Sequence, residues 1–215
     1  IVEVSSGKRH QGIPGAIQID PCYVESATDR SRYYPRYDSP EAARLLPLDK
    51  LRQALGQLGL RGSDAVLLYG AGHLYPMGLA RVAWALLAAG LETVAWLDGG
   101  LPAWQAAGGV LEPHRKVTAT QDFGPAPDRY SQLVTSDLSG FQGQLADLRS
   151  HAEYTGKQQD RYPFFRSCGH IPGALWAGNW TRLMRPGPAW TFRPLAEIQK
   201  DWLQQGIVPD REVVF

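Results

Sequence analysis

The stretch Ile13-Pro14-Gly15-Ala16-Ile17 occurs a second time, with one conservative change, as Ile171-Pro172-Gly173-Ala174-Leu175. Each copy is followed later by a run with apolar residues at positions i, i+3 and i+7, which predicts an amphipathic helix. These helices are expected over residues 48–58 and 195–205. The chain is therefore predicted to contain the same structural unit twice.

The later part of the repeat keeps a constant spacing of 147 residues, for example from Gly59 to Gly206. Each of these glycines comes directly after a predicted helix, as a C-terminal stop, and a predicted strand follows it. In this register Phe215 corresponds to Leu68, whereas the first unit continues to about Gly109. The sequence therefore predicts one complete domain followed by an incomplete copy.

These spacings predict the domain boundaries. We expect a first domain over residues 1–110, a linker over 111–133 and an incomplete second domain over 134–215. The linker segment holds three prolines and shows little hydrophobic periodicity. The second domain is expected to end before the loop that follows its central strand.

In the first unit, continuous apolar strands alternate with helices. Strands are predicted at 1–4, 65–69 and 93–97, and helices also at 79–89 and 102–107. This alternation predicts an α/β architecture with a mainly parallel sheet that is covered by helices on both faces. Ligands bind such sheets at the carboxyl ends of the strands, so the glycine-bearing loop 70–78 is the first place to look for chemistry.

The composition excludes several classes of protein. The 215 residues are 44% hydrophobic and 20% charged, which allows an ordinary folded core. A net charge of +1 excludes the strongly basic balance of a nucleic-acid-binding protein, and no apolar run approaches the roughly 18 residues that span a bilayer. Two cysteines exclude a disulfide scaffold, and the five histidines show no paired metal-binding spacing. We expect neither a metal nor a cofactor.

Several motifs resemble those of the rhodanese family. The run Asp147–Ser150 (DLRS), then Glu153–Gly156 (EYTG), then Gly169–Ala174 (GHIPGA) is similar to the opening of a rhodanese domain. The run Leu97–Trp104 (LDGGLPAW) resembles the end of one. The arrangement is similar to that of tandem-domain bacterial sulfurtransferases. In that family one domain is degenerate, and the other, usually the C-terminal one, carries the catalytic cysteine.

The resemblance implies sulfur transfer through a cysteine persulfide. A thiolate at the end of the central strand attacks the outer sulfur of thiosulfate or a similar donor, and the persulfide passes its sulfur to cyanide or a thiol acceptor. Backbone N–H groups of the following loop form an anion-binding nest that lowers the thiol pKa. In the first unit Gly70 holds the cysteine position, so that domain is expected to be non-catalytic. In the second unit the position falls two residues after Phe215, so residues 1–215 alone are expected to be inactive.

Asp147 and Arg149 lie at the end of the first strand of the second unit. They are interpreted as a structural ion pair that braces the floor of the active site, with direct contact to substrate as the alternative. Glu153 stands where some thiosulfate-using relatives have arginine. A carboxylate there does not favour the binding of a dianion.

The two copies differ just before the shared isoleucine. His170 is predicted to be a hydrogen-bonding prop for its turn, whereas the first copy has Gly12 at that place. The neighbouring Cys168 is interpreted as a small, partly buried residue rather than a relay thiol. The sequence neither supports nor excludes a disulfide between Cys22 and Cys168.

Two other functions compete with sulfur transfer. The glycines around Gly70 lie between a strand and a helix, as in a dinucleotide site, but Tyr75 replaces the third glycine of that fingerprint. A rhodanese-like module that binds a protein partner or a sulfur carrier without catalysis is the stronger alternative, because the first loop has no thiol.

The resemblance also implies the partners of the enzyme. They are a small-molecule sulfur donor and a thiol or cyanide acceptor, with no nucleic acid and no membrane. The sequence does not determine the oligomeric state. No targeting segment is recognisable, and the resemblance to multi-domain bacterial sulfurtransferases favours the periplasm.

Overall fold

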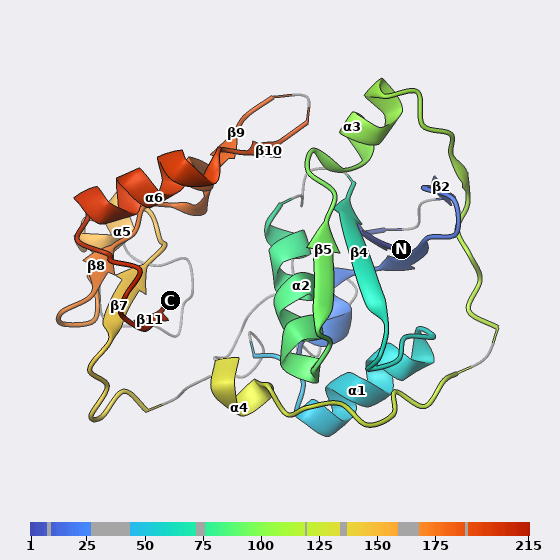
Figure 1. Ribbon diagram of the computed structural model, residues 1–215, viewed down its shortest axis with the longest axis horizontal. Coiled ribbons are helices and arrows are strands. Elements are labelled where there is room, and N and C mark those ends of the chain that lie inside the picture. The colour runs from blue at the N-terminus through green and yellow to red at the C-terminus, as the bar shows by residue number, and fades with distance from the viewer. Residues whose placement is uncertain are drawn as a thin grey trace. The chain divides into compact units, whose positions relative to one another are not determined.

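The computed structural model of the chain describes residues 1–7, 10–26, 44–71, 76–118, 120–133, 137–158, 168–187 and 189–215. The chain divides into two compact units, Ile1–Ser136 with Pro188–Trp190 and Asp137–Gly187 with Thr191–Phe215. Each unit contains its own parallel sheet (Figure 1).

The first unit contains strands, helices and one short 3₁₀ helix. In chain order they are β1 (Val2–Val4), β2 (Gln11–Gly12), β3 (Ile17–Ile19), the 3₁₀ helix η1 (Pro21–Val24), α1 (Leu48–Gln57), β4 (Ala65–Gly70), α2 (Met77–Ala89), β5 (Thr93–Trp96), α3 (Gly100–Ala106), β6 (Glu112–Pro113) and α4 (Tyr130–Leu133). The main sheet has the order β3-β1-β4-β5, and all its pairs are parallel. Parallel strands need crossover connections, and α1 lies in the connection from β3 to β4 and α2 in that from β4 to β5. The predicted α/β architecture is confirmed.

One face of this sheet is covered by α2, which packs against β1, β4 and β5 (Figure 1). Leu79, Val82 and Leu86 of α2 are at most 1% exposed. The helix ends at Gly90, whose left-handed φ of 108° allows the chain to turn away. The apolar run of the sequence predicted this helix. Burial of its apolar side chains stabilises the packing of α2 on the sheet.

On the other face of the sheet, α3 and residues that follow it cover the carboxyl end of β4. Tyr69 of β4 is completely buried in a cluster with Leu101 of α3, and Trp104 and Leu111 pack against that cluster. Gly100 begins α3, and a Cβ at this glycine would lie 2.6 Å from the carbonyl oxygen of Gly70. The start of α3 is therefore pressed against the end of β4.

The segment predicted as a linker lies against the first unit over much of its length. The N–H of Gly62 donates to the carbonyl oxygen of Phe123 at 2.7 Å, and the Phe123 residue is only 5% exposed. Arg52 of α1 donates to the carbonyl oxygens of Ala126 and Pro127, each at 2.9 Å. These contacts bind the segment to α1 and to the loop before β4.

The second unit repeats part of this plan. Its elements are β7 (Gln144–Asp147), α5 (His151–Tyr154), β8 (Leu175–Trp176), the 3₁₀ helix η2 (Trp180–Leu183), β9 (Met184–Arg185), β10 (Thr191–Phe192), α6 (Leu195–Gln204) and β11 (Val213–Val214). The parallel sheet has the order β8-β7-β11, with β9 and β10 forming a separate antiparallel pair. This order matches β3-β1-β4 of the first unit, so the repeat read from the sequence is a repeat of topology.

Strand pairing fixes which residues are equivalent. Val2 pairs with Ile17, the last residue of the repeated motif, and Ala146 pairs with Leu175, its counterpart. Glu3, the residue after Val2, therefore corresponds to Asp147. By the strand spacing Ser5 corresponds to Arg149, and by the alignment of the repeated motif Gly12 corresponds to His170 and Gln18 to Trp176.

Candidate active site

The carboxyl end of β7 is the place where the sequence-predicted residues of the second unit meet. In the first unit Val4 pairs with Gly70, the predicted degenerate position. The residue equivalent to Val4 is Leu148, which lies between Asp147 and Arg149. Because β11 runs parallel to β7, as β4 does to β1, the carboxyl end of β11 lies at the same edge of the sheet as these two residues.

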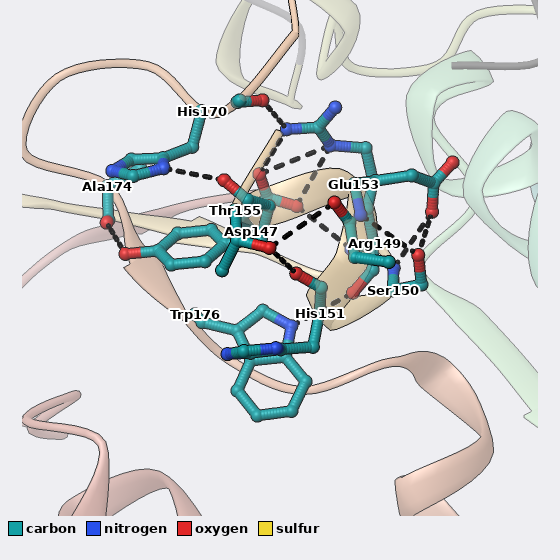
Figure 2. Close-up of polar contacts among 12 residues, drawn as sticks. Asp147, Arg149, Ser150, His151, Glu153, Thr155, His170, Ala174 and Trp176 are labelled. Atoms are coloured by element: carbon teal, nitrogen blue, oxygen red, sulfur yellow. Dashed lines mark hydrogen bonds and ion pairs between the residues drawn. The ribbon is translucent and has the colours of Figure 1, made fainter. Parts of the chain in front are cut away.

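Asp147 and Arg149 form a compact ion pair (Figure 2). The backbone N–H and the Nε of Arg149 donate to Asp147 Oδ1 at 2.9 and 3.1 Å, and Nη2 donates to Oδ2 at 2.7 Å. The Asp147 side chain is 11% exposed and that of Arg149 is 37% exposed. The predicted pair is therefore present as a bidentate clamp at the strand end, partly open to solvent.

The pKa of Asp147 reflects this clamp. Burial alone would raise the pKa of the carboxyl group, but hydrogen bonds from the Arg149 side chain and backbone, together with the Arg149 charge, outweigh burial and hold the pKa below its ordinary value. The imidazole of His170 adds a smaller effect in the same direction. Asp147 is therefore a fixed negative charge at neutral pH and is not suited to act as a proton donor.

Arg149 also positions the loop that carries the repeated motif. Its Nη2 donates to the carbonyl oxygen of Gly169 at 2.6 Å, and its own carbonyl oxygen accepts from Trp176 Nε1 at 3.0 Å. One side chain therefore ties the end of β7 to the loop before β8. Removal of Arg149 would free both Asp147 and this loop.

His170 is held within that loop, as predicted for a prop. Its Nδ1 lies 2.8 Å from the carbonyl oxygen of Tyr154, and the two rings stack with centroids 3.9 Å apart. The Tyr154 hydroxyl donates to the carbonyl oxygen of Ala174 at 3.0 Å. The predicted hydrogen-bonding role of His170 is confirmed.

Glu153 is used at the start of α5. Its Oε2 accepts from the backbone N–H and the hydroxyl of Ser150 at 3.0 and 2.5 Å, while Ser150 Oγ accepts from the Glu153 N–H at 3.3 Å. This reciprocal pattern is a capping box, which satisfies two free backbone donors of the helix. The carboxylate has a structural task, and it also places negative charge beside the strand end.

The equivalent place in the first unit is filled by a buried polar cluster that the sequence reasoning missed. Glu3 is 0% exposed, and its carboxylate accepts from the hydroxyls of Ser5 and Tyr69 at 2.7 and 2.8 Å. His114 Nε2 lies 3.1 Å from Glu3 Oε2. A Cβ at Gly12 would collide with the Tyr69 hydroxyl and with His114. Gly12, which stands where the second copy has His170, is the one sequence difference that marks this place, but it does not identify the members of the cluster.

Gly70 therefore ends β4 beside a closed cluster. Residue 71 is described as well, and residues 72–75 of the predicted loop 70–78 lie outside the described residues. The backbone of Gly70 faces the start of α3, and its neighbour Tyr69 is part of the cluster around Glu3. The assignment of Gly70 as a degenerate catalytic position stays a prediction.

The two cysteines differ in their surroundings, and both are free thiols. Cys22 is buried in η1, and burial, followed by the neighbouring carboxylate of Asp20, raises the pKa of its thiol to about 12. Cys168 is exposed, one residue before the glycine that Arg149 holds, whereas the sequence suggested a partly buried residue. Its exposure follows from its place in a loop outside the core of the second unit.

The described residues offer no arrangement of three or more histidine, cysteine, aspartate or glutamate side chains that suits a metal ion. In the part of the chain that the structure describes, no helix has the length and apolar character to cross a membrane.

Comparison with known proteins places these observations in a family. A family model described as "Rhodanese-like domain" matches residues 1–107. A thiosulfate sulfurtransferase of Pseudomonas aeruginosa is 31% identical over 228 residues, which cover 100% of this chain and 74% of that protein. A 3-mercaptopyruvate sulfurtransferase of Escherichia coli is 28% identical over 207 residues, covering 94% of this chain and 67% of the relative.

A longer relative has a similar fold. Thiosulfate sulfurtransferase YnjE of Escherichia coli is 32% identical over 216 residues, and the match covers 94% of this chain but 46% of that protein. A crystal structure of YnjE matches with a TM-score of 0.77 at 26% identity, over 99% of this chain and 51% of the other. The chain thus spans about half the length of YnjE. Because all of this chain matches 74% of the Pseudomonas enzyme at 31% identity, and because its two units repeat one sheet topology, the chain belongs to the rhodanese family.

Proposed function

We propose that the whole protein is a sulfurtransferase that carries sulfane sulfur as a cysteine persulfide. The donor is thiosulfate or a similar sulfur compound, and the acceptor is cyanide or a thiol. Membership of a family whose relatives are named sulfurtransferases supports the reaction class. The single observation that supports the proposal is the parallel register of β11 against β7, in which the carboxyl end of β11 lies at the same edge of the sheet as the clamp formed by Asp147 and Arg149.

The nucleophile of this proposal is a cysteine two residues after Phe215, at the position equivalent to Gly70. In that register the cysteine would be the strand partner of Leu148, as Gly70 is of Val4 in the first unit. Its thiolate attacks the outer sulfur of the donor, the sulfur–sulfur bond of thiosulfate breaks, and sulfite leaves with the electron pair. An acceptor then attacks the outer sulfur of the persulfide and restores the thiolate.

Asp147 and Arg149 are supporting residues in this proposal. Arg149 holds the loop at Gly169 and neutralises Asp147, so the carboxylate does not repel an anionic donor. The partly exposed guanidinium of Arg149 also contributes positive charge at the end of β7. The anion itself is bound by N–H groups of the loop after the cysteine.

The first unit is proposed to act without catalysis. Gly70 has no side chain to carry sulfur, and the polar cluster around Glu3 occupies the space beside it. These observations favour the alternative function, a module that binds a protein partner or a sulfur carrier, for this unit alone. The same alternative applies to the whole protein if the residue at the proposed position is not cysteine.

The test uses the whole protein and thiosulfate. Intact mass spectrometry should show one added sulfur atom after incubation with the donor, and addition of cyanide should remove it and yield thiocyanate. Replacement of the proposed cysteine by serine should abolish both, while the matched variant Cys168→Ser should keep both. A wild-type protein that gains no sulfur and forms no thiocyanate would contradict the proposal.

A further inference from the structure

A hollow of about 380 Å³ lies in the first unit, where the turn between α1 and β4 meets the segment that follows β6. Polar and charged side chains from both pieces of chain dominate its lining, which includes Gly59, Arg61, Asp64, Arg115 and Gln121. Its volume is within the range of small-molecule sites, about 300–1,000 Å³. The hollow lies near the start of β4, at the opposite end of that strand from Gly70.

The two walls of the hollow are fixed by backbone hydrogen bonds. The N–H of Arg115 donates to the carbonyl oxygen of Ala16 at 2.8 Å, and the N–H of Gln121 donates to that of Gly56 in α1 at 2.9 Å. The segment is therefore anchored on both sides of the hollow, where it passes α1 (Figure 1). Because these bonds hold the walls without a ligand, binding would pay little for ordering the chain.

Arg61 is oriented in the hollow by a neutral partner. Its Nη2 donates to Gln121 Oε1 at 2.6 Å, and an amide oxygen positions the guanidinium without cancelling its charge. The carboxylate of Asp64 instead accepts from the backbone N–H of Arg61 at 2.8 Å. Among the residues that the structure describes, Asp64 forms no ion pair with either arginine of the hollow. The positive charge of Arg61 therefore stays available.

The guanidinium of Arg115 has no hydrogen bond or ion pair with any residue in the described part of the chain. It reaches over the end of α1, since a Cβ built at Gly59 would lie 3.9 Å from Arg115 Nη2. Its five N–H donors remain for another group. With two arginines and one aspartate, the charged lining carries a formal net charge of +1.

A phosphate group matches this set of donors. Each guanidinium fork binds a pair of oxygens, and a phosphate has enough oxygens for two forks, whereas a single carboxylate satisfies one. A phosphomonoester is also mostly a dianion at neutral pH. Thr118 adds a hydroxyl to the lining, and Val117 adds an apolar side chain that a small organic group can contact.

We propose that this hollow binds a small phosphomonoester, with its phosphate between Arg61 and Arg115. Arg61 belongs to the turn before β4 and Arg115 to the segment after β6, so the bound phosphate joins the two pieces of chain. Binding should therefore raise the melting temperature and protect the segment from hydrogen exchange. No step of sulfur transfer uses this hollow, so the inference does not depend on the proposed function.

The test is a titration of the whole protein with glycerol 3-phosphate at constant ionic strength. Phosphorus NMR should show saturable binding, thermal unfolding should show a rising melting temperature, and peptide-resolved hydrogen exchange should show protection within residues 111–123. Inorganic phosphate should bind more weakly, while acetate and sodium chloride should have little effect. Equal affinity for inorganic phosphate and glycerol 3-phosphate would assign the hollow to the free ion and overturn the ester.

The decisive variant is Arg115→Gln. It removes the charge and the fork of a side chain without a described partner, so we expect affinity for glycerol 3-phosphate to fall about tenfold or more with the ligand-free melting temperature unchanged. Arg115→Lys restores the charge but not the fork and should recover only part of the affinity. Lys116→Gln removes a neighbouring exposed charge outside the lining and is the matched control, which should keep the wild-type affinity.

Three results would overturn the proposal. The first is a wild-type protein with no saturable binding of glycerol 3-phosphate. The second is an equal loss of affinity in Lys116→Gln and Arg115→Gln, which would show unspecific attraction of the anion. The third is an Arg115→Gln variant that melts earlier without ligand yet binds normally, as expected if the guanidinium only complements the carboxyl end of α1. If Arg115→Gln does not fold, Arg61→Gln provides the second variant for the same affinity measurement.

Discussion

Glu3 and Asp147 occupy the same position in two copies of one sheet, yet their carboxylates are held by different partners. Glu3 is buried under hydroxyl groups and the ring of His114, whereas Asp147 is paired with a partly exposed guanidinium. Each acid lies on the central strand, opposite Gln18 in the first sheet and Trp176 in the second. The repeat has thus kept an acid at the strand end while its surroundings have diverged.

The Asp147 clamp is expected to contribute to stability in a pH-dependent way. Asp147→Asn removes a charge that accepts four hydrogen bonds from Arg149, and should lower the free energy of unfolding by about 1 kcal/mol at pH 7, since the pair is partly screened by solvent. Because the folded-state pKa of Asp147 is lowered, the contribution is complete above the unfolded value of about 3.9 and is lost as the pH falls through the folded pKa.

Urea unfolding of wild type and variant at a series of pH values measures this effect. The difference in unfolding free energy should be present at pH 7 and decline in acid. Asp210→Asn, at an exposed carboxylate of the same unit, is the control and should change stability by less than about 0.5 kcal/mol. A difference for Asp147→Asn that persists unchanged into strong acid would show that the charge is not its source.

The buried cluster of the first unit is expected to be sensitive to a single hydroxyl. The Tyr69 hydroxyl donates to Glu3 and accepts from the N–H of Ile13 at 2.9 Å. Tyr69→Phe would leave a buried N–H without a partner and a buried carboxylate with one donor fewer, which should cost about 1–3 kcal/mol. Denaturant unfolding with an unchanged slope would measure it. Tyr130→Phe, on a partly exposed ring of α4, should have little effect.

Gly100 is expected to tolerate alanine far less well than Gly108, although both have positive φ values, 54° and 80°. A Cβ at Gly108 meets nothing within 4 Å, so Gly108→Ala carries only the backbone cost of about 1 kcal/mol. A Cβ at Gly100 would press on the carbonyl oxygen of Gly70. Gly100→Ala should therefore lower the melting temperature clearly more than Gly108→Ala, and equal shifts would contradict the close approach.

The two cysteines should differ strongly in reactivity. Burial raises the pKa of the Cys22 thiol to about 12 from an ordinary value of 9.0, which leaves about a thousandfold less thiolate at pH 8 than in an ordinary cysteine. Cys168 is exposed. Iodoacetamide at pH 8 should therefore label Cys168 of the folded protein well before Cys22, as read by peptide mass spectrometry. Unfolding in urea should equalise the two rates, and equal rates in the folded state would show that Cys22 is accessible.

Regular elements were predictable because their signals are local. The stripe through Leu51 and Leu55 predicted α1, and both residues are completely buried. The apolar run that ends at Gly90 predicted α2, although the helix begins at Met77, two residues earlier than its first predicted residue. The short helix after the glycine pair also begins two residues early, at Gly100, since Gly99 adopts a left-handed conformation that starts the turn there.

The polar cluster was not predictable, because its members come from distant parts of the chain. Glu3 reads as an exposed polar residue in an alternating strand, and nothing in the sequence joins it to His114, 111 residues later. The prolines around Phe123 suggested a linker. The carbonyl oxygen of Phe123, however, accepts a hydrogen bond from Gly62, and the residue is buried. In the second unit the ion pair was predictable, since Asp147 and Arg149 lie on one strand end two residues apart.

The antiparallel pair of β2 with β6 has a practical meaning for how this protein can be divided. It brings His114 to Glu3, and the chain beyond it closes over Gly62 and Arg52. A fragment that ends at residue 110, the boundary that the repeat suggests, would lack His114. The buried carboxylate of Glu3 would then lose one of its partners, and water would reach this part of the sheet. A fragment meant to keep these contacts of the first unit has to extend to Pro127. The segment that reads as a linker in the sequence is therefore part of the folded first unit.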